Sequence, residues 1–160
     1  MADPFAQIVD SLDAPMLVVT ACDGSERSGC LVGFATQCSI APRRWLICIS
    51  KSNHTFRVAR ATQTVVVHFL RVDQVELARL FGSQTEDVVD KFARCAWRDG
   101  PGGAPILAGC DWIAGRVLER IDLGDHEGQL LGVFDAGHEH ADAPQLGFQA
   151  VRGLPPGHPA

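Results

Sequence analysis

The sequence lacks the features that would place the protein in a membrane or on a nucleic acid. No uninterrupted apolar stretch approaches the ~20 residues that a membrane-spanning helix needs, and runs such as Val65-Val66-Val67 are of strand size. Basic residues number 14 against 19 acidic ones, and the formal net charge is −5. Because nucleic-acid binders usually carry a basic stripe, this composition argues against DNA, RNA and anionic membranes as partners.

Targeting and redox signals are equally sparse. The N-terminal segment is acidic and has no basic n-region, so the sequence predicts no secretory signal. Six cysteines are present, but none forms a CxxC pair and most lie in apolar stretches. We therefore expect reduced thiols in a cytoplasmic protein rather than a disulfide framework. No GxGxxG fingerprint occurs, which argues against a separate nucleotide-binding domain.

What is present suits one globular domain. The chain has 160 residues, of which 46% are hydrophobic and 21% charged, ordinary values for a soluble protein. A chain of this length buries roughly 70% of its unfolded surface, so its core needs no metal or disulfide. We expect one domain over residues 1–153 and a flexible tail, rich in Pro and Gly, over 154–160.

Strand patterns outnumber helix patterns along the chain. Strands are expected over residues 15–21, 29–38, 45–50, 64–70, 106–121, 129–135 and 145–151. Helices are expected from Asp3-Pro4 to Leu12, over 53–61 and over 73–81, with a further turn or two over 86–93. Most strands are not followed by a helix, so the pattern favours a mostly antiparallel sheet closed as a barrel, with a few flanking helices.

Several short motifs follow one another in a fixed order. They are Asp23-Gly24, the segment from Gly29 to Pro42, the run Ser50-Lys51-Ser52-Asn53-His54-Thr55, Leu77-Ala-Arg-Leu-Phe81 with Lys91-Phe92, Pro105-Ile-Leu107, and Gly124-Asp125-His126 before Gly132-Val133. Each motif is weak alone. Together, from about Pro15 to Gly153, they resemble the flavin reductase-like family.

The resemblance implies a fold, a cofactor and partners. The fold is the FMN-binding split barrel, a Greek-key antiparallel barrel that is usually a homodimer with FMN near the subunit interface. The implied activity is reduction of FMN or FAD by NADH or NADPH, with the reduced flavin handed to a partner monooxygenase. An alternative is a split-barrel protein that binds FMN, or the deazaflavin F420, as an electron carrier or ligand-binding module without turning over free flavin. A barrel that binds no ligand is the least favoured alternative.

The run from Ser50 to Thr55 suits the flavin phosphate. It lies where a strand ends and a helix begins, and free N–H groups at a helix N-terminus favour an anion. Ser52 and Thr55 add hydroxyl groups and Lys51 adds a positive charge. The alternative is ordinary N-capping by Ser52 or Asn53 with a solvated Lys51, and His54 is either a phosphate contact or a solvated helix residue.

The segment Thr36-Gln37-Cys38-Ser39 follows an apolar strand. The resemblance places it along the isoalloxazine and ribityl groups, where Gln37 offers a donor and an acceptor while Thr36 and Ser39 offer hydroxyls. Alternatively, these residues only satisfy backbone groups at a strand end. Many relatives have Ser and an Asp-Pro-Pro turn where this chain has Gly33 and Ala41-Pro42-Arg43, which puts one hydroxyl contact in doubt.

The resemblance also assigns the catalytic pair, Asp125 and His126, next to the flavin and the nicotinamide. Histidine suits this place because it exchanges a proton near neutral pH. The alternative is an exposed turn in which Asp125 caps the backbone.

Other conspicuous residues carry weaker signals. His138 and His140 would share one face of a strand, but nothing supplies a third ligand, so no metal site is expected. Trp97 and Trp112 suit packing in the core or at a subunit interface. His68 stands in a predicted strand where relatives often carry Asn, and the sequence assigns it no role.

Overall fold

The computed structural model describes residues 1–82, 90–139 and 143–155. Its main feature is a seven-stranded sheet in which all neighbouring strands are antiparallel, in the order β2-β1-β5-β8-β9-β4-β3. These strands are β1 (Leu17–Cys22), β2 (Arg27–Val32), β3 (Ala35–Ser39), β4 (Arg44–Ser50), β5 (Thr64–Phe69), β8 (Asp111–Asp122) and β9 (His126–Gly137), and a separate pair is formed by β6 (Trp97–Asp99) and β7 (Pro105–Leu107).

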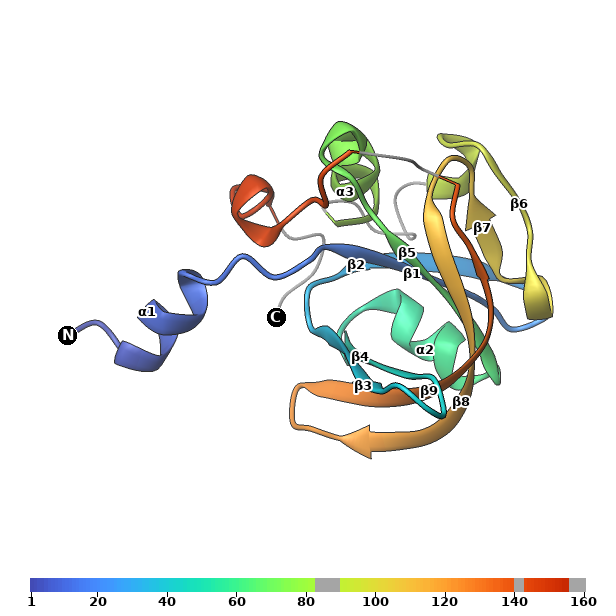
Figure 1. Cartoon of the computed structure of the whole chain (residues 1–160), viewed down its shortest axis with the longest axis horizontal. Helices are drawn as coiled ribbons and strands as arrows, with labels where there is room; N and C mark the ends of the chain where they lie inside the picture. Colours follow the sequence, from blue (N-terminus) through green and yellow to red (C-terminus); the bar gives the residue numbers. More distant parts are fainter. Residues whose placement is uncertain (83–89, 140–142, 156–160) are drawn as a thin grey trace.

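The sheet curls so that its two edges approach each other. Strands β2 and β3 stand at opposite ends of the strand order, yet Gly33 and Phe34 alone join them in the chain. The Phe34 carbonyl also accepts a hydrogen bond of 2.9 Å from the Cys48 N–H on β4. Two residues cannot span a flat sheet of this width, so the strands wrap around a central core (Figure 1). The predicted mostly β, antiparallel architecture with few helices is confirmed.

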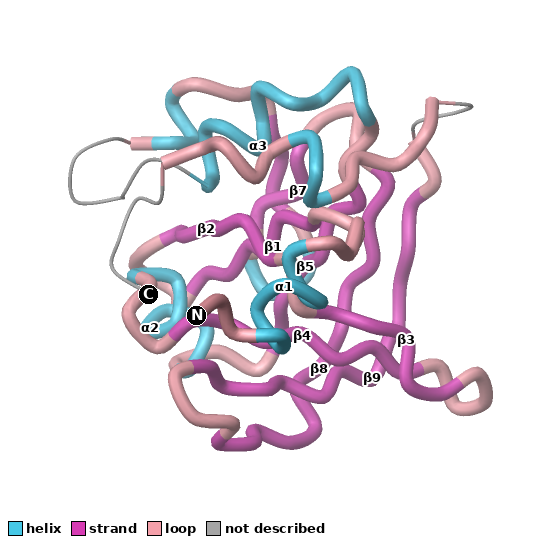
Figure 2. The backbone as a smooth tube through the Cα atoms, turned by 90° about the vertical axis from the view of Figure 1, so that its left-hand side faces the viewer, coloured by secondary structure: helices cyan, strands magenta, loops and turns pink. Residues whose placement is uncertain are grey.

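The second and third helices pack against β1 and β2, whereas the N-terminal helix stands away from the sheet in Figure 1, and Figure 2 shows the third helix at the top of the molecule. The helices are α1 (Pro4–Asp10), α2 (His54–Arg60) and α3 (Val75–Gly82), and 3₁₀ turns lie at η1 (Val72–Gln74), η2 (Lys91–Ala93), η3 (Pro101–Gly103) and η4 (Phe148–Ala150). In the described part of the chain, no helix combines the length and the apolar character that crossing a bilayer would require.

Strand alternation divides the apolar residues between two main cores. Leu17 and Val19 of β1 point into the curled sheet, where they join a cluster that includes Val58 of α2. Val18, between them, points to the other face and joins a cluster with Ala78 and Phe81 of α3. Because successive strand residues face opposite sides, one Val-rich strand supplies both cores.

Three sequence predictions about strands need correction. The strand expected over 29–38 is broken at Gly33–Phe34, and the one over 106–121 is interrupted at Ala108–Cys110, where Gly109 takes a φ of +73°. The strand expected over 145–151 is wrong: Gln145 and Gly147 each form an isolated bridge, and a 3₁₀ turn follows. In each case the apolar residues indicate that the segment is buried. Whether its backbone forms a continuous strand depends on hydrogen bonds to distant segments of the chain. The turn expected over 86–93 is described only from residue 90, where η2 lies.

His68 is a buried connector between strands. Its side chain is inaccessible to solvent, its Nδ1–H donates to the Val18 carbonyl at 3.0 Å, and its Nε2 accepts from the Leu107 N–H at 3.0 Å. These two partners fix one neutral tautomer, since a carbonyl can only accept and an amide N–H can only donate. Burial lowers the pKa of His68 to about 4. The histidine thus ties β5 to β1 and β7.

Of the three tryptophans, Trp112 is buried in the chain's own interior and Trp97 is partly buried. The Trp112 side chain packs against Val66 and Ile106 with only 7% of the residue exposed, and its indole N–H donates to Glu139 at 3.1 Å. The Trp97 indole N–H donates to the Phe92 carbonyl at 2.9 Å. Packing within one chain therefore accounts for most of the Trp112 surface, which leaves little of this side chain for contact with a second copy.

Candidate functional site

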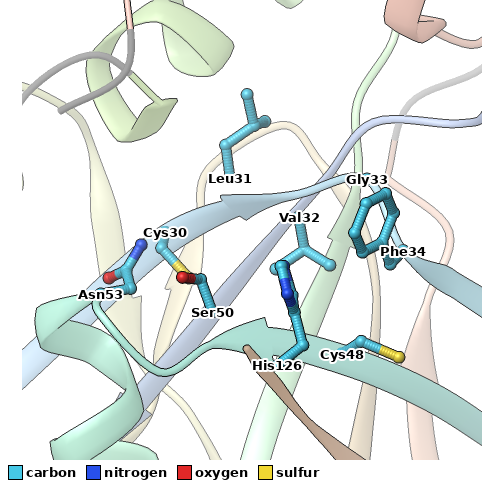
Figure 3. A pocket seen from close by; sticks show the side chains of 9 residues that line it. All are labelled: Cys30, Leu31, Val32, Gly33, Phe34, Cys48, Ser50, Asn53 and His126. Atoms are coloured by element: carbon cyan, nitrogen blue, oxygen red, sulfur yellow. The ribbon is translucent and has the colours of Figure 1, made fainter. Parts of the chain in front are cut away.

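A small pocket opens where the end of β2 meets β4, β9 and the start of α2. Its volume is about 160 Å³. The lining residues are Cys30, Leu31, Val32, Gly33, Phe34, Cys48, Ser50, Asn53 and His126. Figure 3 shows His126 and Phe34 side by side at one end of the pocket, with Ser50, Asn53 and Cys30 toward the other.

Sheet register brings two sequence-predicted residues together in this pocket. Ser50, at the end of β4, pairs directly with His126, at the start of β9. The next residue, Lys51, continues the pairing by donating its N–H to the Asp125 carbonyl at 2.9 Å. Residues far apart in the chain are therefore fixed across one antiparallel ladder, which is more rigid than a loop.

The His126 ring is oriented by neighbours on two sides. Its Nδ1 lies 2.7 Å from Asp125 Oδ1, and the hydrogen bond from His126 is the main reason that the pKa of Asp125 lies below its ordinary value. The Phe34 ring packs on the imidazole with centroids 4.9 Å apart. Nε2 has no hydrogen-bond partner among the residues that the structure describes. An ionised Asp125 favours the proton on Nδ1, which leaves Nε2 as the atom that can exchange a proton.

The polar run after β4 forms its own hydrogen-bond pattern. The hydroxyls of Ser50 and Ser52 lie 3.0 Å apart, and Asn53 caps α2 by accepting from the Thr55 N–H at 3.0 Å. Lys51 Nζ lies 2.6 Å from Asp122 Oδ1, and this contact lowers the pKa of Asp122. The N-capping interpretation is thus correct for Asn53, while Lys51 is ion-paired rather than simply solvated.

Two residues predicted to hold phosphate, His54 and Thr55, do not line the pocket. The Thr55 side chain is buried, and its hydroxyl lies 2.8 Å from the Ser28 hydroxyl. His54 lies between Glu26, at 2.6 Å from its Nε2, and Arg57, at 2.5 Å from its Nδ1. In this arrangement Thr55 ties α2 to β2, and His54 belongs to a surface charge cluster.

The residues predicted to follow the flavin ring lie on the exposed edge strand β3. Thr36, Gln37 and Cys38 are exposed, and Ser39 is half-buried. Gln37, Cys38 and Ser39 line a separate shallow depression of about 670 Å³ together with Ile40. Because Gly33–Phe34 runs directly into β3, this surface is continuous with the first pocket along the backbone.

Sequence reasoning missed the apolar wall of the pocket. Phe34 and Cys48 line it, and neither was singled out beforehand. Burial raises the pKa of the Cys48 thiol, so this side chain acts as an apolar surface rather than as a nucleophile. The sequence offers little signal for Phe34, because only the structure shows that this large apolar side chain stays 61% exposed at a strand break.

The histidines near residue 138 show no metal site. No group of three or more His, Cys, Asp or Glu side chains with suitable geometry occurs among the described residues. His138 Nδ1 instead lies 3.0 Å from Asp111 Oδ1, which also accepts from the Glu139 N–H. His140, the other half of the predicted pair, lies outside the described residues.

The curled antiparallel sheet, with a histidine pocket where its two edges approach each other, has the architecture of a split barrel. The family model "Flavin reductase like domain" matches residues 9–154, and the chain belongs to this family. One relative is the reductase component of 4-hydroxyphenylacetate 3-monooxygenase from Pseudomonas aeruginosa, 28% identical over 133 residues that cover 82% of this chain and 78% of the relative. Another is the FMN reductase (NADH) RutF of Bradyrhizobium diazoefficiens, 26% identical over 117 residues that cover 72% of this chain and 64% of the relative.

Solved structures agree with this assignment. The NADH:FAD oxidoreductase SgcE6 of Streptomyces globisporus superposes with a TM-score of 0.81 at 27% identity, covering 92% of this chain and 89% of that protein. The same enzyme in complex with NAD and FAD fragments gives a TM-score of 0.79. The resemblance stated from the motifs is therefore confirmed.

Proposed function

We propose that this chain is an NAD(P)H-dependent flavin reductase that moves a hydride from a nicotinamide to FMN or FAD and supplies reduced flavin to a partner monooxygenase. The observation that carries the proposal is the pocket histidine, His126, held by Asp125 and facing Ser50 across a strand ladder. Relatives named as NADH-linked flavin reductases and as reductase components of monooxygenases support it.

The residues present fit a flavin nucleotide whose two portions occupy two neighbouring surfaces. Ser50 and Asn53 offer hydroxyl and amide groups, and Phe34 offers an apolar face. A volume of about 160 Å³ is smaller than the roughly 300–1,000 Å³ that encloses a ligand of this size. We therefore infer that one portion of the flavin fills the pocket and that the rest lies over the exposed β3 segment, near Gln37 and Ser39.

In this mechanism the flavin, when bound, supplies the hydride acceptor and the nicotinamide supplies the hydride. The protein contributes alignment. When the nicotinamide ring and the flavin ring are held together in one site, the hydride is transferred within an ordered complex. His126 accepts or releases a proton at Nε2 while Asp125 holds Nδ1. Phe34 keeps the imidazole in one orientation and shields its face from water.

Anaerobic stopped-flow absorbance tests the proposal. NADH or NADPH should bleach FMN or FAD in the presence of the purified chain. His126→Ala should slow the bleaching by about tenfold or more, the range found for positioned acid–base groups. His138→Ala is the matched control, since this histidine lies at the surface beside Asp111, and it should leave the rate unchanged.

The outcomes separate the alternatives. Nicotinamide oxidation that scales with added excess flavin identifies a reductase, whereas a tightly bound flavin or F420 that never exchanges identifies a carrier. Absence of both flavin binding and nicotinamide oxidation would refute the proposal.

We also propose that the protein is a homodimer in the cytoplasm. Sedimentation at micromolar concentration should give about twice the chain mass of 17.2 kDa. All six cysteines are free thiols in the structure, which supports a reducing compartment. A fluorescent fusion that localises outside the cytoplasm would contradict the second part.

A further inference from the structure

The N-terminal helix α1 has an apolar face that its own chain leaves uncovered. Phe5 is 70% exposed, Ile8 62% and Val9 40%, no residue of the helix is buried, and Leu12, just after the helix, is 54% exposed. These side chains recur at helical spacing and so form one stripe. Figure 1 shows α1 standing away from the sheet at the end of an extended linker.

A helix this short needs a partner to persist. It spans seven residues, whereas isolated helices shorter than about 12–15 residues are marginal in water. Asp3 caps it by accepting from the Phe5 N–H at 3.1 Å, and Pro4 occupies its first turn. A cap contributes only about 1 kcal/mol, so the stability of α1 must come from covering its apolar stripe.

The C-terminal end of α1 is tied to a distant segment of its own chain. Gln149 Nε2 donates to the carbonyls of Asp10 at 2.7 Å and Leu12 at 2.8 Å, and the Gln149 N–H donates to Asp13 at 2.9 Å. These bonds fix the C-terminal end of α1 beside η4. In Figure 1 this place lies at the left, whereas the middle of β8 and β9 lies at the right and the turn between them at the lower left.

An open groove on the outer face of β5, β8 and β9 offers a complementary surface. Its volume is about 580 Å³, and it is lined by Gln63, Thr64, Arg116, Leu118, Gly132 and Phe134. Leu118 is 49% exposed and Phe134 51%. A Cβ at Gly132 would lie 3.2 Å from Leu118, so the glycine keeps the floor of the groove open to a close approach.

The charges of the two surfaces are opposite. Arg116 is exposed and makes no ion pair or side-chain hydrogen bond within the described ranges, and no acidic residue lines the groove. The α1 segment carries Asp3 and Asp10 and no basic residue. An acidic amphipathic helix and an apolar groove with a free arginine therefore attract each other.

We propose that α1 of one copy docks in the β8–β9 groove of a second copy, and that the second copy returns the same contact. Docking of an amphipathic helix into an apolar groove is a common recognition mode, and a two-fold axis makes two such contacts equal. The proposal rests on the homodimer put forward above. It names the surface that joins the subunits, and it assigns the exposed stripe of α1 to that surface.

Sedimentation velocity with two variants and their mixture tests the exchange. Ile8→Asp alters the helix and Leu118→Asp alters the groove, and each variant should weaken dimerisation at least about a hundredfold because both symmetric contacts are lost. An equimolar mixture should regain dimers, since the intact helix of one variant fits the intact groove of the other. Val72→Asp, at a similarly exposed residue outside both surfaces (47%), should remain dimeric.

Several results would overturn the exchange. It is wrong if the wild-type chain is a monomer, if Ile8→Asp stays dimeric, or if the two monomeric variants fail to associate when mixed. The last result would instead indicate helix–helix and groove–groove contacts. The sedimentation experiment contains no flavin or nicotinamide, so its result does not depend on reductase activity. A failure of the reductase proposal would be seen only in the bleaching assay.

Discussion

The buried histidine, His68, predicts a specific loss of stability in mild acid. In the folded chain its pKa is about 4, mainly because of burial, against an ordinary value of 6.5. Since the pKa is lower in the folded state, the unfolded chain takes up a proton that the folded chain refuses. The contribution of His68 to stability is therefore complete above pH 6.5, and it declines as the pH falls toward 4.

The size of this effect follows from the two pKa values. The difference of about 2.5 units corresponds to a loss of roughly 2 kcal/mol at pH 5 and about 3 kcal/mol at pH 4. Such a loss is a large share of the stability of an ordinary domain. The structural cause is clear, because a second proton on the ring would face the Leu107 N–H, which has no acceptor to offer.

Urea unfolding at several pH values between 4 and 8 measures the effect. His68→Asn removes the titrating group and, at a pH-independent cost, one of the two hydrogen bonds. The difference in unfolding free energy between the wild type and this variant should shrink by about 2 kcal/mol between pH 7 and pH 5. A difference that stays constant over this range would refute the reasoning, since the exposed carboxylates titrate equally in both proteins.

Three further predictions concern the pocket and the sheet. Phe34→Ala should slow hydride transfer about twofold to tenfold, as expected from the loss of an aromatic contact of about 0.5–1.5 kcal/mol with His126, and stopped-flow reduction would show no change if the ring has no positioning role. Thr55→Val should lower the free energy of unfolding by about 1–3 kcal/mol, because it leaves the Ser28 hydroxyl without this partner. In fluorescence titrations it should weaken the binding of FMN and of riboflavin equally. A selective loss of FMN affinity would place the phosphate at Thr55. Gly115→Ala should cost about 1–3 kcal/mol in thermal unfolding, since its Cβ would lie 2.7 Å from Leu131 Cβ, and an unchanged Tm would show that β8 and β9 can separate at this point.

Local pattern was a good guide wherever neighbouring residues decide the conformation. Asp3 and Pro4 begin α1 as expected, Asn53 caps α2, and the Asp23 carboxylate accepts from two backbone N–H groups in the predicted turn. The Val- and Thr-rich segment at β1 and the Val65-Val66-Val67 run of β5 predicted strands, and the structure contains them. These features depend on side chains within about four residues, so they can be read directly from the sequence.

The order of the motifs determined the family, but only the tertiary structure decided which residues meet. Ser50 and His126 share a pocket because β4 and β9 pair in one register, and a shift of one residue would turn Ser50 to the other face. The same long-range packing buries Thr55 against Ser28. It also places the Phe34 ring against the His126 imidazole, although Phe34 has no polar group that would mark it as a site residue. Register and burial arise from contacts between segments tens of residues apart, and no local pattern encodes them.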